Sequence, residues 1–274
     1  MTSPAAIRIR SAAIAIPMVV LLICFLPRVA FTACVSAVII LALRECTRMV
    51  GWQGLVEAWA VPVFGGVCLL ATEWHREDGG GGLVTIGWIA TGLLAVVLGS
   101  LAVLGRPPSR DVVTTKAGTM TLLFFYCVAG GVLATEVREQ MDWGIWLLVL
   151  LFIVWAVDSG AYACGNWLGR YKMAPSVSPG KTWEGTVGGA VLGMAAGVAC
   201  HLVFNWLDSL AMALLVTALL VLAAVFGDLI VSVIKRTWNV KDSGEFLPGH
   251  GGIVVRIDSL LGALAVAAFI VFLG

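Results

Sequence analysis

Three polar clusters interrupt the apolar second half of this chain, and their side chains are of the kinds that bind metal ions and phosphate groups. The first begins at Asp158 (Asp-Ser-Gly-Ala-Tyr), and the second begins at Ser178 (Ser-Pro-Gly-Lys-Thr-Trp-Glu-Gly). The third and longest extends over residues 227–259. Carboxylates are typical Mg²⁺ ligands, whereas lysine and arginine bind phosphate oxygens. Because charges within apolar segments are costly to bury, these clusters predict a functional site.

The second cluster places Lys181 at the expected start of a helix, beside the hydroxyl groups of Ser178 and Thr182. Its Gly-Lys-Thr sequence is similar to part of a phosphate-binding P-loop. However, Pro175 stands where that motif requires glycine, and no strand is expected before it. Free N–H groups and the positive end of the helix dipole still favour phosphate here. We therefore expect these three residues to bind phosphate, with a basic loop and a Ser or Thr helix cap as the alternative. Asp158 likewise predicts a cation or substrate contact, or a cap of the following helix.

The third cluster contains the deepest expected carboxylate, Asp228. It precedes Lys235 by about two helical turns, which places it about 10 Å further into the apolar segment. A divalent cation or a buried base would explain an aspartate at that depth. His250 lies among glycines that permit sharp turns, and hydrogen bonding explains it as well as catalysis does. The other charged candidates in this cluster are Arg236, Lys241, Asp242, Arg256 and Asp258.

Together the three clusters predict a membrane-embedded, metal-dependent enzyme that acts on a polyphosphate and a lipid. Carboxylates for Mg²⁺ and several bases for phosphate, within an apolar surround, are typical of phosphoryl and nucleotidyl transfer. A transporter is the alternative from another class. It would place charges along several spans near the membrane midplane, and the first five expected spans carry few.

The elements that must position these residues are membrane-spanning helices. Of the 274 residues, 60% are hydrophobic and only 12% are charged, with a formal net charge of +1. This composition excludes a soluble globule, a disordered chain and a nucleic-acid binder that works through positive charge. The seven scattered cysteines have no metal-binding spacing and are interpreted as packing residues. We predict an all-α polytopic membrane protein. About nine transmembrane helices are expected, over residues 11–27, 29–47, 53–73, 83–104, 118–136, 142–158, 184–206, 209–235 and 255–273.

The distribution of lysine and arginine predicts the orientation. With the N-terminus cytoplasmic and the C-terminus outside, 14 of the 17 basic residues fall on the cytoplasmic side, as do all three clusters. The loop at 106–116 separates N-terminal transmembrane helices (residues 1–117, about four spans) from C-terminal catalytic helices and cytoplasmic loops (residues 118–274). The basic and then apolar start resembles a signal peptide, but the many later spans favour an uncleaved first helix. We expect an integral protein of a bacterial inner membrane, with its site facing the cytoplasm.

The third cluster resembles the signature of the phosphatidate cytidylyltransferases, also called CDP-diglyceride synthases. That signature contains serine, two variable residues and Lys-Arg, then Lys-Asp, then Pro-Gly-His-Gly-Gly, then Asp-Arg-x-Asp. Here it stands as Ser232-Val-Ile-Lys235-Arg236, then Lys241-Asp242, then Pro-Gly-His-Gly-Gly at 248–252, then Val255-Arg256-Ile-Asp258. The first two clusters are also similar to those of the family, so the resemblance covers residues 158–259.

The resemblance implies that CTP and phosphatidate react to give CDP-diacylglycerol and pyrophosphate. It also implies Mg²⁺, a monovalent cation such as K⁺, and a homodimer. The expected catalytic residues are Asp228, Asp258, Lys235 and Arg256, with Asp228 and Asp258 as metal ligands. The expected substrate-binding residues are Ser178, Lys181, Thr182, Arg236, Lys241, Asp242, His250 and Asp158.

One departure from the family pattern concerns the metal site. The family has aspartate before the arginine of Asp-Arg-x-Asp, and this chain has Val255, which cannot bind a cation. Losing a carboxylate from a Mg²⁺ site costs several kcal/mol of charge stabilisation, and each 1.36 kcal/mol is tenfold in rate. Three interpretations follow. The chain is an active enzyme in which Asp258 or Asp242 compensates, an impaired form of a normal enzyme, or a diverged relative that only binds nucleotide or lipid or uses another lipid phosphate. A smaller departure is Gly180, where the family often has lysine or asparagine.

Overall fold

Long helices form most of the chain. The computed structural model describes residues 4–52, 54–77, 116–244 and 252–273. Within these ranges the helices are α1 (Pro4–Phe25), α2 (Arg28–Met49), α3 (Leu55–Glu77), α6 (Lys116–Arg138), α7 (Ile145–Leu168), α8 (Trp183–Phe204), α9 (Leu210–Thr237) and α10 (Val254–Leu273). A 3₁₀ turn (Asp142–Gly144) precedes α7, and two short strands, β1 (Lys172–Ala174) and β2 (Ser178–Thr182), precede α8.

Six of the described helices are long and apolar enough to cross a membrane, namely α2, α6, α7, α8, α9 and α10. The apolar parts of α1 and α3 are shorter, at Ala15–Phe25 and Ala58–Glu73. These helices confirm the predicted helical, integral membrane architecture. The expected span at 83–104 lies outside the described residues, so the number of nine spans stays a prediction, as does the orientation.

Two parts of the sequence prediction are wrong around the first two clusters. The helix expected to end at 158 continues to Leu168, so Asp158 lies inside α7 and caps no helix. The extra turns contain the small residues Gly160, Ala161, Cys164 and Gly165, which pack closely against α8. Residues 172–182 were expected to be a loop in an all-α fold, but they form an antiparallel hairpin with Lys172 opposite Thr182.

Glycines allow α7 and α8 to pack backbone against backbone. A Cβ at Gly160 would lie 2.7 Å from the carbonyl oxygen of Gly188, and one at Gly189 would lie 2.6 Å from that of Val157. The glycine-rich face of α8 is therefore used within the chain. The homodimer that the family resemblance implies stays a prediction.

A second close crossing joins α9 and α10. A Cβ at Gly262 would lie 2.5 Å from the carbonyl oxygen of Ala223 and 2.9 Å from the Cα of Gly227. The next residue after Gly227 is Asp228, and Asp258 lies one turn before Gly262. The crossing therefore brings the two predicted metal ligands to neighbouring positions on two helices.

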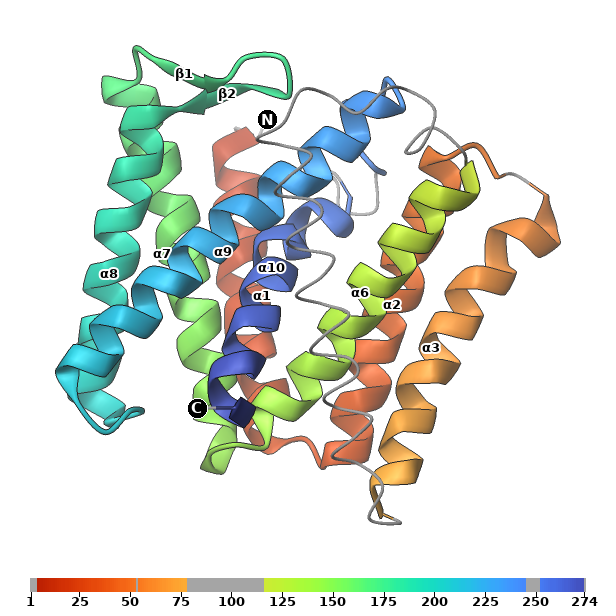
Figure 1. Cartoon of the computed structure of the whole chain (residues 1–274), viewed down its shortest axis with the longest axis horizontal. Coiled ribbons are helices and arrows are strands. Elements are labelled where there is room, and N and C mark those ends of the chain that lie inside the picture. Colours follow the sequence, from red (N-terminus) through yellow and green to blue (C-terminus); the bar gives the residue numbers. More distant parts are fainter. Residues whose placement is uncertain (1–3, 53, 78–115, 245–251, 274) are drawn as a thin grey trace.

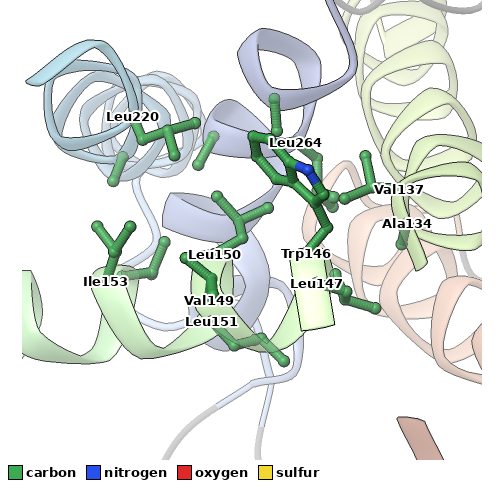
Figure 2. Close-up of a cluster of buried hydrophobic side chains, with 14 of the residues drawn as sticks. Ala134, Val137, Trp146, Leu147, Val149, Leu150, Leu151, Ile153, Leu220 and Leu264 are labelled. Atoms are coloured by element: carbon green, nitrogen blue, oxygen red, sulfur yellow. The ribbon is translucent and has the colours of Figure 1, made fainter. Parts of the chain in front are cut away.

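The apolar core lies between α6, α7, α9 and α10. Figure 2 shows Trp146, Leu150 and Leu264 packed at its centre, and all three are buried. The Trp146 and Trp206 rings meet edge to face, with centroids 4.7 Å apart. Figure 1 shows that the hairpin, the C-terminal end of α9 and the N-terminal end of α10 lie at one end of the bundle.

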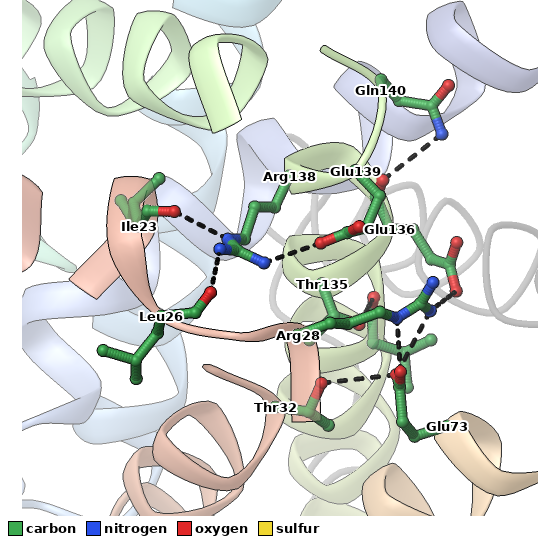
Figure 3. A network of polar contacts seen from close by, with 11 residues as sticks. Ile23, Leu26, Arg28, Thr32, Glu73, Thr135, Glu136, Arg138, Glu139 and Gln140 are labelled. Carbon is green, nitrogen blue, oxygen red and sulfur yellow. Dashed lines mark hydrogen bonds and ion pairs between the residues drawn. The ribbon is translucent and has the colours of Figure 1, made fainter. Parts of the chain in front are cut away.

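The opposite end of the bundle contains a network of buried and partly buried charges (Figure 3). Arg28 of α2 forms an ion pair with Glu73 of α3, which also accepts a hydrogen bond from Thr32. Arg138 of α6 donates to the backbone carbonyl oxygens of Ile23 and Leu26 at the end of α1. This network joins α1, α2, α3 and α6 away from the three polar clusters.

Candidate active site

A cavity of about 230 Å³ contains residues from all three polar clusters. We call it the polar cavity. Elements α7, β2, α8, α9 and α10 all contribute to its walls, so residues distant in sequence meet only because the bundle is folded. Its polar lining residues are Asp158, Tyr162, Lys181, Thr182, Thr186, Asp228 and Ser259.

Lys181 and Asp228 form an ion pair across this cavity. The Nζ atom of Lys181 lies 2.8 Å from Oδ2 of Asp228, and both side chains are partly accessible. The hydroxyl of Ser232, one turn along α9, donates to Oδ1 of the same carboxylate at 3.2 Å. A base therefore compensates the deep aspartate in this structure, which was one of the two explanations for it.

Asp258 is a buried carboxylate next to the polar cavity and is not part of its lining; 4% of its surface is exposed. Its Oδ1 atom accepts a hydrogen bond from the N–H of Ser259 at 2.8 Å, and its backbone carbonyl accepts one from the hydroxyl of Tyr126 at 3.1 Å. Its Oδ2 atom is buried and has no hydrogen-bond partner among the described residues. An unpartnered buried carboxylate oxygen is costly, and this atom has the chemistry to bind a cation.

The acidic residues would suit a Mg²⁺ ion only if substrate phosphates supplied most of its ligands. Asp158 and Asp258 both lie close enough to Asp228 for their negative charges to repel its own. Even so, the described residues include no group of three Asp, Glu, His or Cys side chains close enough to form a complete metal site. Mg²⁺ commonly uses only one or two protein carboxylates and completes its shell with water and phosphate oxygens. The orphaned oxygen of Asp258 and the carboxylate of Asp228 match that requirement.

Val255 lies on the first turn of α10, three residues before Asp258. Side chains three apart share one face of a helix. An aspartate at 255 would therefore lie on the same face as the orphaned carboxylate. As it stands, α10 has no acidic residue in its first turn.

The residues of the second cluster have different environments. Lys181 lines the polar cavity, whereas Ser178 pairs with Ala174 in the hairpin and is not part of the cavity lining. Thr182 is the N-cap of α8, and its hydroxyl accepts a hydrogen bond from the N–H of Gly185 at 3.2 Å. The helix cap, which was the alternative interpretation, is therefore present at Thr182, next to the lysine that lines the cavity, and phosphate binding by these residues stays a prediction.

The basic residues of the third cluster surround the site from the end of α9 and the start of α10. Arg236 donates from Nε to the carbonyl oxygen of Val177, which ties α9 to the hairpin turn. Lys235 interacts electrostatically with Asp258, and Arg256 with Asp158. The other expected contacts, Lys241 and Asp242, are exposed beyond α9, and His250 lies outside the described residues.

Arg256 also lines a second cavity, of about 290 Å³, whose other lining residues are apolar or small. We call it the apolar cavity. It lies between α1, α2, α6, α7 and α10, and Arg256 is its only charged lining residue within the described part of the chain. Prominent members of its wall are Ile23, Phe31, Val35, Leu151, Trp155 and Leu260. Ser259 lines the polar cavity and Leu260 the apolar one, so α10 separates the two.

Glu45 of α2 is a site-associated residue that sequence reasoning missed. It is 5% exposed, and it accepts hydrogen bonds from the backbone N–H groups of Ile253 and Val254. The available signal was an acidic residue within an expected span, which is uncommon in a membrane helix.

Comparison with known proteins gives consistent matches. The sequence profile of the cytidylyltransferase family matches residues 6–273. A phosphatidate cytidylyltransferase of Haemophilus influenzae is 33% identical over 263 residues, covering 88% of this chain and 90% of that protein. Those of Mycobacterium bovis and Brucella suis are 31% and 32% identical, covering 90% and 80% of this chain and 81% and 72% of the relatives.

Proposed function

Because the chain belongs to the cytidylyltransferase family, we propose that it transfers the cytidylyl group of CTP to phosphatidate, giving CDP-diacylglycerol and pyrophosphate. The observation that carries this proposal is the pair of cavities separated by α10. One is polar, with a lysine and carboxylates, and the other is apolar with an arginine in its wall. A reaction between a nucleotide and a lipid phosphate needs both environments side by side.

The polar cavity is the proposed CTP site. Lys181 lies beside the N-terminal end of α8, where a lysine and the helix dipole both favour phosphate. Phosphate oxygens of CTP can replace Asp228 as the partner of Lys181, which leaves the aspartate available to a cation. Asp228 and Asp258 would hold Mg²⁺, with Asp158 nearby, and the ion would neutralise charge on the reacting phosphates.

The apolar cavity and Arg256 form the proposed phosphatidate site. A guanidinium binds a phosphate strongly, whereas the surrounding apolar wall suits an acyl chain. Lys235 interacts with Asp258, and it would contribute positive charge between the lipid phosphate and the nucleotide. In this arrangement the phosphate of phosphatidate attacks the α-phosphorus of CTP and pyrophosphate leaves.

The membrane depth of the site agrees with this assignment. Trp167, Tyr171 and Trp183 lie near the hairpin and are highly exposed, as is typical of aromatic residues at a membrane–water interface. We propose that the hairpin end faces the cytoplasm of a bacterial cell, with the N-terminus on the same side. The homodimer and the K⁺ requirement are proposed on the family resemblance alone.

Val255 bears on the rate rather than on the identity of the reaction. We propose that Asp258 and Asp228 support turnover with a weakened metal site. A diverged chain that binds CTP or lipid without turnover is the second possibility, and the absent carboxylate favours it. The two differ in one measurable result, the formation of product.

The decisive experiment measures CDP-diacylglycerol and pyrophosphate formed by the purified full-length chain in detergent. CTP and phosphatidate are supplied with a Mg²⁺ titration, and ATP and GTP serve as nucleotide controls. We expect Mg²⁺-dependent product with CTP only. CTP binding without product would support the non-catalytic alternative, whereas product only with an ether-lipid phosphate would change the assigned lipid.

A further inference from the structure

Glu45 joins the two chain segments that flank residues 245–251. Its Oε2 atom accepts a hydrogen bond from the hydroxyl of Ser243 at 3.1 Å and another from the N–H of Val254 at 3.2 Å. Its Oε1 atom accepts one from the N–H of Ile253 at 2.8 Å. One buried side chain of α2 therefore binds the end of the segment after α9 and the start of α10.

The carboxylate takes the place of a local helix cap. The first N–H groups of a helix have no partner within the helix and attract negative charge. Ile253, which directly precedes α10, has no side-chain acceptor, and the first turn has no acidic residue. Glu45 provides both the acceptors and the charge from another helix.

Two glycines make room for this carboxylate. A Cβ at Gly244 would lie 2.9 Å from Oε1 of Glu45. A Cβ at Gly252 would lie 2.9 Å from the backbone nitrogen of Gly244 and still closer to Glu45 and Ser243. Gly252 is the last glycine of the Pro-Gly-His-Gly-Gly sequence, so this contact gives a steric reason for a glycine there.

The contact continues into the proposed phosphate and metal residues. The carbonyl oxygen of Ile253 accepts hydrogen bonds from the N–H groups of Arg256 and Ile257. Fixing the N–H of Ile253 therefore fixes the first turn of α10. Arg256 belongs to that turn and Asp258 to the next one.

We propose that Glu45 is a positioning residue that sets the start of α10, and with it Arg256 and Asp258, for the transfer reaction. This inference rests on the proposed function. Glu45 does not line either cavity, so it acts through the backbone of α10 rather than on substrate.

The test compares Glu45→Gln with a matched control, Glu73→Gln. Both residues are carboxylates on long helices, and Glu73 is paired with Arg28 at the other end of the bundle. We expect Glu45→Gln to lower kcat by about 10- to 100-fold, as is typical when a supporting contact of a metal site is lost. We expect the KM for CTP to change less than kcat. Glu73→Gln should lower the melting temperature and leave kcat near its original value.

Hydrogen–deuterium exchange supplies a readout that does not depend on turnover. Amides of residues 252–258 should exchange faster in Glu45→Gln than in the unmodified chain or in Glu73→Gln. If the unmodified chain makes no product, the proposed function fails, and the exchange data still decide whether Glu45 holds α10. Unchanged exchange together with an unchanged kcat would overturn the inference.

Ser243→Ala is a milder variant that tests the same contact if Glu45→Gln does not fold. Ser243→Ala removes one of the three donors and leaves the carboxylate in place. We expect a smaller decrease in kcat and faster exchange over the same residues. If kcat and the exchange rates of residues 252–258 are the same in Ser243→Ala as in the unmodified chain, the positioning role is contradicted.

Discussion

Lys181 on β2 and Asp228 on α9 form an ion pair across the polar cavity, with Nζ and Oδ2 2.8 Å apart. In the proposed reaction each partner has a separate task, the lysine with phosphate and the aspartate with Mg²⁺. The pair would then represent the enzyme before CTP binds. It balances two charges that would otherwise be costly at this depth.

The first prediction concerns this pair. Lys181→Met and Asp228→Asn should each lower kcat/KM for CTP by about 10²- to 10³-fold, because each removes a charge that acts on the reacting phosphates. The losses of the two single variants should multiply, or slightly more than multiply, in the double variant, because the lysine and the aspartate have separate tasks in the proposed reaction and their ion pair stabilises only the enzyme without CTP. Steady-state CDP-diacylglycerol formation by all four proteins measures the coupling. A double variant that loses no more than one single variant would show that the two residues do not have separate tasks.

The second prediction concerns position 255. Val255→Asp should raise the rate at limiting Mg²⁺ by about tenfold and lower the Mg²⁺ concentration for half-maximal activity, because it adds a carboxylate near Asp258. Val255→Asn, with similar size and no charge, is the control. Equal Mg²⁺ curves for the unmodified chain and Val255→Asp would place the ion elsewhere.

The third prediction separates the two substrates. Arg256→Gln should raise the KM for phosphatidate by about 10- to 100-fold, the range expected for a lost hydrogen bond to a charged group. The KM for CTP should change much less. Lys172→Gln, which neutralises an exposed base on β1 outside both cavities, should leave both constants near their original values. A larger effect of Arg256→Gln on CTP would reassign this residue to the nucleotide.

The fourth prediction concerns stability. Gly189→Ala should destabilise the protein by about 1–3 kcal/mol, because the new methyl group would overlap the α7 backbone. Gly180→Ala is the matched control, since nothing lies within 4 Å of a Cβ at that position. Thermal unfolding in detergent should show a lower melting temperature for Gly189→Ala only. Equal melting temperatures would mean that α7 and α8 separate at little cost.

Hydropathy predicted the helices well because each span is a local property of about 20 residues. All eight α-helices in the described ranges coincide with expected spans to within a few residues at most ends. The main exceptions are the start of α1 and the end of α7, where the expected span was ended at Asp158 because a charge within a span is costly. Beyond it, Gly160 and Cys164 pack against α8, and such contacts depend on the folded bundle.

The candidate site was predictable in its composition but not in its pairings. Lys181, Asp228 and Asp158 were identified as charges in apolar surroundings, and the structure brings them to one cavity. The ion pair between Lys181 and Asp228 could not be predicted. It connects α9 with a hairpin, and the sequence did not predict that hairpin. Glu45 was missed for a related reason, since its partners are about 200 residues away.

The close contact between Gly227 of α9 and Gly262 of α10 determines which parts of these two helices can change in sequence. No side chain separates α9 and α10 there, so backbone contact alone sets their spacing. Asp228 and Asp258 adjoin that crossing and inherit their separation from it. Residues on the outward faces of these helices can therefore be replaced without changing the distance between the two carboxylates.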